Sequence, residues 1–90
     1  MHLGTAYERD LRILLVAAQE VELGEALPVE TLDLAQRSMK EMNTVGDVAH
    51  FVIYSDRARE ARLVGNIQEA LAWEKARESY YDRLPDGLRW

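Results

Sequence analysis

The sequence predicts an all-α fold, a small antiparallel bundle of about four helices that forms two helical hairpins. Apolar residues recur at steps of three and four in four segments, and glycine, proline or capping residues separate these segments. No segment shows the alternation of apolar and polar residues that indicates a half-buried strand. Ninety residues suffice for one core, so we expect a single domain over residues 1–90, with residues 1–4 and 86–90 as flexible or docking tails.

The first helix is expected to start at Thr5 and to end before Gly24. Thr5 and Glu8 have the spacing of a capping box, and Gly24 suits the positive φ angle that commonly ends a helix. The apolar stripe between them is wide, which predicts that this helix is the most buried of the four. Its members are Tyr7, Leu11, Leu14, Ala18 and Val21, widened by Ile13, Leu15 and Ala17.

The second helix is expected over residues 28–42, because Pro28 suits a first helical turn and Asn43 suits a helix end. Its predicted stripe consists of Val29, Leu32, Ala35 or Gln36, Met39 and Met42.

The third helix is expected over residues 45–64, with Thr44 as its N-cap and Asp47 three residues later. Gly65 and Asn66 then predict a tight turn rather than one continuous rod. The fourth helix follows over residues 67–84, and the sequence from Pro85 to Gly87 ends it. One face of the third helix is apolar at its start and becomes small and polar towards its end; it is expected to hold Val48, Phe51, Val52, Ser55, Ala58 and Arg62.

Charge and composition narrow the class of partner. The net charge is −5, and no Lys or Arg lies between Arg12 and Arg37, which leaves an acidic edge that would repel a phosphate backbone. Nucleic acid is therefore a disfavoured partner. The longest apolar run, residues 13–18, is far shorter than the roughly 20 residues that cross a membrane, so we expect no membrane partner and a cytoplasmic location. The chain contains no cysteine, which excludes disulfides and thiolate ligands.

The sequence shows no pattern typical of an enzyme. Asp47 and His50 resemble the Glu-x-x-His element of di-iron helix bundles, but the element occurs once and with Asp in place of Glu. A half-exposed histidine is the simpler interpretation. The serines fall in predicted mid-helix positions, and no glycine-rich phosphate loop is present. We therefore expect no catalytic residues, no cofactor and no metal.

The aromatic residues give the strongest indication of function. Six of the seven lie in the second half of the chain, and Tyr80 and Tyr81 are adjacent, so they cannot both face the core. Trp90 lies beyond the predicted end of the last helix. Exposed Tyr, Trp and Arg side chains commonly anchor protein interfaces. The predicted partner-binding residues are Tyr54, Arg57, Trp73, Tyr80, Tyr81 and Trp90.

Residues 65–70, with the sequence GNIQEA, resemble the start of the second helix of a tetratricopeptide repeat over about 20 residues. The resemblance then departs from the family pattern, because the next small residue, Ala76, comes one position early and Ala61 stands where a large aromatic residue is usual. It therefore assigns no family.

These observations favour a small acidic protein-interaction or assembly module, acting as a homodimer or as an accessory or regulatory subunit without catalytic activity. Two alternatives remain open at this point. Residues 44–84 could form a helix-turn-helix-like DNA-binding regulator that uses Arg57, Arg59 and Arg62. The acidic character would also suit a protein that mimics nucleic acid and occupies a basic groove.

Overall fold

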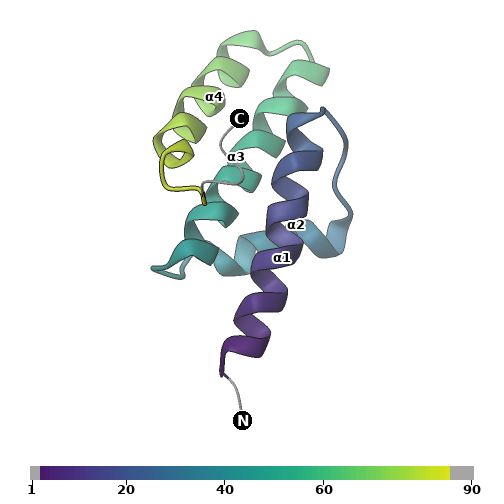
Figure 1. Cartoon of the computed structure of the whole chain (residues 1–90). Helices are drawn as coiled ribbons and strands as arrows, with labels where there is room; N and C mark the ends of the chain where they lie inside the picture. Colours follow the sequence, from purple (N-terminus) through teal and green to yellow (C-terminus); the bar gives the residue numbers. More distant parts are fainter. Residues whose placement is uncertain (1–2, 86–90) are drawn as a thin grey trace.

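The computed structural model describes residues 3–85, with side chains from Ala6 onward. Within this range the fold is all-α, without strands, and consists of four helices: α1 (Leu3–Glu22), α2 (Val29–Ser38), α3 (Thr44–Leu63) and α4 (Ile67–Tyr81) (Figure 1). The predicted small helical bundle is therefore confirmed. Of the expected tails, residues 1–2 and 86–90 lie outside the described range, whereas Leu3 and Gly4 already belong to α1.

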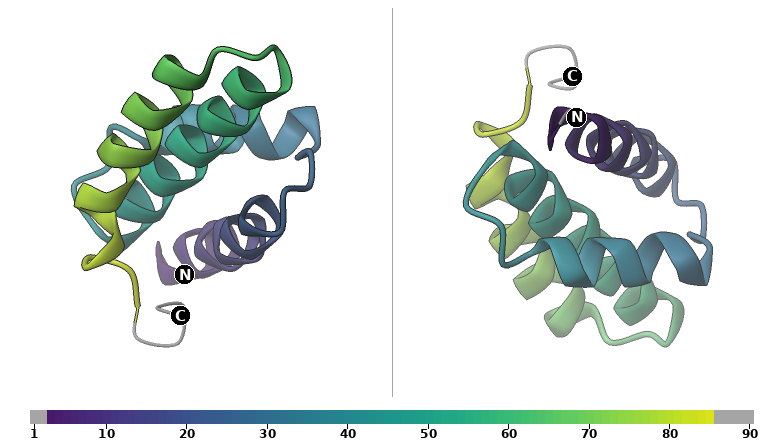
Figure 2. Two further views of the ribbon diagram at one scale, coloured as in Figure 1. Left: turned by 90° about the horizontal axis from the view of Figure 1, so that it is seen from above. Right: turned by 90° about the horizontal axis from the view of Figure 1, so that it is seen from below.

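The centre of the bundle is α3, which packs against each of the other three helices. Figure 2 shows α3 between α1 and α4, while α2 lies across the bundle from the end of α1 to the start of α3. Eleven of the 20 residues of α3 are buried. The expectation that the first helix is the most buried was therefore wrong, because α1 presents one face to the core and α3 is covered on several sides.

The core forms where α1 and α2 meet α3. Leu14, Ala17, Ala18 and Val21 supply the buried stripe of α1, as predicted, although Leu11 and Leu15 are only partly buried. Leu84 is also buried, three residues beyond the end of α4. The other members of the core cluster are Leu27, Ala35, Val45, Val48, Ala49, Phe51, Val52 and Ile53.

Two glycines end α1 and α3 in the same way. Gly24 has φ +83° and Gly65 has φ +79°, the left-handed region that favours glycine. In each case the residue after the glycine donates its backbone N–H five residues back, from Glu25 to Glu20 O (3.1 Å) and from Asn66 to Ala61 O (2.8 Å). This is the Schellman arrangement, which satisfies carbonyls at a helix end. The predicted turn at Gly65 is confirmed, and α4 runs back along α3.

The start of α3 differs from the prediction by one residue. Asn43, expected to terminate the second helix, is instead the N-cap of α3, and its side-chain oxygen accepts from Gly46 N at 3.1 Å. Thr44 is the first helical residue. Gly46 lies so close to the preceding turn that a Cβ there would be 1.7 Å from Glu41 O. The α2–α3 turn therefore requires glycine at position 46.

Several other expectations at the helix ends and edges were wrong. Thr5 lies inside α1, because that helix begins at Leu3, and α4 ends at Tyr81 rather than near residue 84. Ile13 and Val29 are exposed because neither faces α3. The remaining exposed members of the predicted helix faces are Tyr7, Met42 and Arg62. Met42 is solvent-exposed because α2 ends at Ser38, so it belongs to the turn. None of the helices described between residues 3 and 85 is long and apolar enough to cross a membrane.

Candidate interaction surface

Three aromatic side chains from α3 and α4 gather on one side of the bundle. The ring centroid of Tyr54 lies 5.4 Å from that of Trp73 and 5.8 Å from that of Tyr80. His50, one turn before Tyr54 on α3, stacks on Tyr80 with ring centroids 4.6 Å apart and an interplanar angle of 7°. All four side chains are partly buried, so each ring packs on its neighbours while part of it stays accessible.

Two arginines lie over rings of this cluster. The Arg57 guanidinium carbon is 4.9 Å from the centroid of Trp73, and that of Arg83 is 4.9 Å from the centroid of Tyr80. Both distances are within the range of favourable cation–π contact. Both arginines remain exposed at the edges of the aromatic surface, and Arg83 also lies 3.6 Å from the carboxylate of Asp47.

A shallow cavity of about 330 Å³ adjoins the cluster, where the α2–α3 turn meets the end of α4. His50, Tyr80 and Arg83 line it on the α3–α4 side, and the partly buried Met39 and fully exposed Met42 line it on the turn side. The remaining lining residues are Lys40, Glu41, Asn43 and Asp47.

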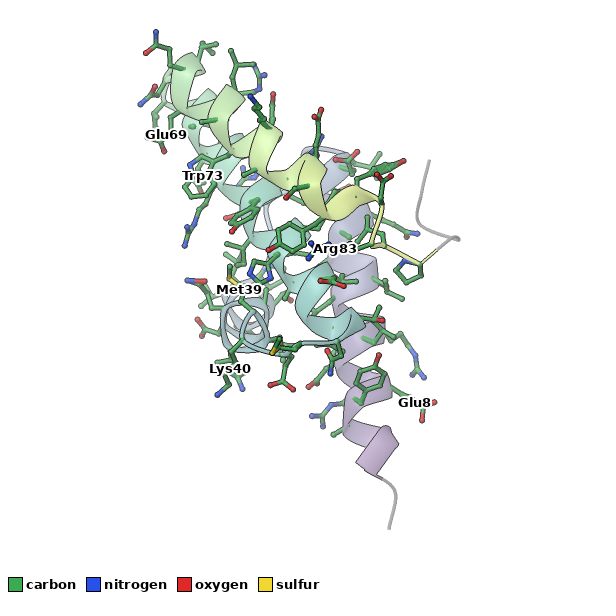
Figure 3. All side chains as sticks on the ribbon, turned by 90° about the vertical axis from the view of Figure 1, so that its left-hand side faces the viewer. Glu8, Met39, Lys40, Glu69, Trp73 and Arg83 are labelled. Atoms are coloured by element: carbon green, nitrogen blue, oxygen red, sulfur yellow. The ribbon has the colours of Figure 1, made fainter. Side chains whose placement is uncertain are left out.

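Figure 3 looks onto this side of the molecule, with Glu69 and Trp73 towards one end and Met39 and Lys40 towards the other. We call this surface the aromatic face. It consists of Met39, Met42, His50, Tyr54, Arg57, Trp73, Tyr80 and Arg83.

Hydrogen bonds and ion pairs hold the aromatic face in place. His50 Nδ1 lies 2.8 Å from Gly46 O, and because a carbonyl oxygen only accepts, Nδ1 carries a proton. Trp73 Nε1 donates to Glu69 Oε2 at 3.3 Å. Asp47 lies 3.6 Å from Arg83 rather than pairing with His50. The described residues hold no group of three or more metal-ligating side chains.

The structure brings together four of the six predicted partner-binding residues: Tyr54, Arg57, Trp73 and Tyr80. Tyr81 is not among them, because its ring lies beside Phe51, with centroids 6.4 Å apart, and lines a different cavity with Arg77. Trp90 lies outside the described residues.

Four members of the aromatic face were not predicted as partner-binding residues: Met39, Met42, His50 and Arg83. The sequence held a signal for two of them, since His50 is four residues from Tyr54 and Arg83 is three residues from Tyr80 in the helix expected over residues 67–84. The two methionines were assigned to the core because the second helix was expected to continue to residue 42. The early end of α2 was not visible in the apolar pattern.

The other arginines of α3 are paired with carboxylates. Arg62 makes a two-pronged ion pair with Glu74 at 2.7 and 2.8 Å, which lowers the pKa of Glu74 and raises that of Arg62. Arg59 lies 3.5 Å from Asp56 and 3.2 Å from Glu60. These contacts neutralise two of the three arginines proposed for a DNA-binding surface.

Asp56 is a buried carboxylate, since only 8% of its surface is exposed. Burial raises the pKa of its carboxyl group, and the neighbouring Arg59 only partly offsets this effect. Within the described part of the chain, Arg59 Nε is a buried polar atom without a hydrogen-bond partner. Arg77 extends the charged network to α1, where it contacts the carboxylate of Glu22, and it approaches Ser55 Oγ at 3.5 Å.

No protein-family model, no curated protein sequence and no solved structure matches this chain.

Proposed function

We propose that this protein is a non-catalytic interaction or assembly module that binds a partner protein through the aromatic face. The observation that carries this proposal is the joining of Tyr54, Trp73 and Tyr80 with two ring-stacked arginines into one accessible surface. Tyr, Trp, Arg and Met are enriched at protein interfaces, and Trp, Tyr and Arg dominate their binding energy.

The packing of the rings supports this role. Each aromatic side chain is already restrained by a neighbouring ring, so binding would cost little further conformational entropy. The fully exposed Met42 and the shallow cavity beside it complement these rigid rings, because a flexible thioether side chain adapts to different partner shapes. A rigid centre with an adaptable edge suits an accessory or regulatory subunit.

The charges on the aromatic face indicate the chemistry of the partner. Arg57 and Arg83 flank the rings, and Lys40 lies at the lip of the cavity. Glu41 and Asp47 line the same cavity, and Asp47 lies 3.6 Å from Arg83, so both signs of charge occur at this edge of the aromatic face. A partner segment with an apolar or aromatic anchor, and a carboxylate placed to reach Arg57 beside Trp73, would therefore fit this surface.

Affinity capture with matched variants tests the proposal. The wild type, an Arg57→Ala/Trp73→Ala double variant and a Lys75→Ala control are immobilised in equal amounts, and captured proteins are quantified by mass spectrometry. Lys75 is exposed on the same helix but outside the aromatic face. We expect at least one partner to be captured equally by the wild type and the control. The amount of that partner captured by the double variant should be lower by about tenfold or more. Circular dichroism confirms that the double variant is folded. A partner set that is unchanged by the double substitution contradicts the proposal.

A further inference from the structure

A second, largely exposed strip runs along α1 to the residue after its end, away from the aromatic face; its one partly buried member is Glu20. Arg9, Ile13, Val16, Glu20 and Leu23 follow one another at alternating steps of four and three residues, the spacing of a coiled-coil seam. Ile13 is 38% exposed, Val16 49% and Leu23 78%, and α1 forms an edge of the molecule in both views of Figure 2. This strip therefore presents apolar side chains that no described element covers fully.

A groove accompanies the strip where α1 passes the start of α2. It measures about 300 Å³ and is lined by Arg12, Ile13, Val16, Glu20 and Thr31. An aliphatic side chain from an adjacent helix could enter this groove and contact Ile13 and Val16 together. Burial of these side chains would supply the favourable free energy of such a contact.

The charges on the strip select the orientation of the adjacent helix. In an antiparallel pair of two α1 helices that places Ile13 opposite Val16, Arg9 of each copy lies opposite Glu20 of the other. In a parallel pair in register, Arg9 would face Arg9 and Glu20 would face Glu20. Polar residues within a coiled-coil seam set register and orientation in this way. Because the arrangement has twofold symmetry, each favourable contact occurs twice.

We propose that a second copy of this chain docks antiparallel along the α1 strip, with Ile13 against Val16 and Arg9 against Glu20. The present contact of Arg9 with its neighbour Asp10, at 3.4 Å, is an exposed pair of low energetic value, and the Arg9 side chain is 69% exposed. Arg9 can therefore turn towards a partner helix at little cost.

The contact involves one helix from each copy, which places it at the small end of protein interfaces. We therefore expect a concentration-dependent dimer with a dissociation constant in the range of about 1–100 μM rather than an obligate assembly. The strip shares no residue with the aromatic face. Self-association and partner binding can consequently occur on the same molecule, and each can be tested without the other.

Sedimentation velocity on charge-reversal variants of the full chain tests this pairing. Arg9→Glu and Glu20→Arg each place like charges opposite one another, so each variant alone is expected to self-associate about tenfold more weakly than the wild type. An equimolar mixture of the two variants restores opposite charges at both ends, so the mixture is expected to form a heterodimer. The double variant Arg9→Glu/Glu20→Arg should form a homodimer again.

Two controls separate this effect from net charge and from misfolding. Lys75→Glu changes the charge by the same amount as Arg9→Glu, and Glu8→Arg by the same amount as Glu20→Arg, at exposed positions outside the strip. Both controls should dimerise as the wild type does, and circular dichroism should show equal helix content in all variants. A wild type that stays monomeric up to about 1 mM overturns the proposal, and so does a mixture that fails to restore association. Neither result bears on partner capture by the aromatic face.

Discussion

Helix propensity and packing predict opposite effects of Gly46→Ala on the stability of the protein. Gly46 lies in the first turn of α3, and in a helix interior alanine is more favourable than glycine by about 1 kcal/mol. In this structure, however, the added Cβ would lie 1.7 Å from the backbone oxygen of Glu41. Real Cβ contacts are essentially never closer than 3.0 Å, so the α2–α3 turn would have to move by more than about 1 Å.

The cost of this movement can be worked out from the contacts of the turn. Glu41 N donates to Ser38 O at 3.0 Å, and Gly46 N donates to the Asn43 cap at 3.1 Å. Loss of a cap typically costs about 1 kcal/mol, and overpacking of a tight site typically costs about 1–3 kcal/mol. After the gain in propensity is subtracted, we expect Gly46→Ala to lower the free energy of unfolding by about 1–3 kcal/mol.

Urea unfolding followed by circular dichroism measures this change, with Gly65→Ala as the matched control. Gly65 has φ +79° and nothing within 4 Å of an added Cβ. Alanine at this position should therefore lower the free energy of unfolding by about 1 kcal/mol, because a positive φ angle is unfavourable for a residue with a side chain. The Gly46 variant should also disturb the aromatic face, because the same turn carries Met42. A Gly46→Ala variant as stable as the wild type, or more stable, would refute the packing argument.

Three further predictions concern the core and the charged network. Leu14 is fully buried, so Leu14→Ala should lower the free energy of unfolding by about 2–5 kcal/mol, measured by urea unfolding. An unchanged unfolding midpoint would contradict the placement of α1 in the core. Because burial raises the folded-state pKa of Asp56, the stability associated with its protonated form is present below pH 3.8 and is lost as pH rises through the folded pKa. Asp56→Asn should therefore be more stable than the wild type near pH 7, with the advantage disappearing in acid; a constant difference across a pH series would show that burial is not the cause. Glu74→Gln should lower the free energy of unfolding by about 0.2–1 kcal/mol, because it breaks the ion pair with Arg62. This loss of stability should be absent at a pH well below 4.5, where Glu74 is protonated in the folded chain as well as in the unfolded one.

The features that depend on local chemistry were predicted from the sequence. Gly24 and Gly65 end their helices because a positive φ angle is a property of one residue and its neighbours. The apolar stripe of α1 was identified at Leu14 and Ala18 because helical periodicity places them on one face. The gathering of Tyr54 and other aromatic residues in the second half of the chain likewise pointed to the α3–α4 side.

The features that depend on how helices pack were not predicted. The need for glycine at position 46 was not predicted, because only the packed turn shows that a side chain there would meet Glu41. Tyr80 and Tyr81 were both proposed as partner-binding residues, since the sequence does not show which of two adjacent rings turns towards His50 and which towards Phe51. Met42 was assigned to a buried stripe because the end of α2 at Ser38 carries no glycine or proline signal.

Site-specific photocrosslinking in living cells tests the role of the aromatic face most directly. A photoreactive phenylalanine derivative is introduced at Met42, which is fully exposed beside the rings, and in a second variant at Lys75, which is exposed outside the aromatic face. We predict a discrete higher-mass adduct with one partner protein from position 42 and no such adduct from position 75. The absence of any adduct at position 42, or identical adducts from both positions, would contradict the proposal that this protein acts through its aromatic face.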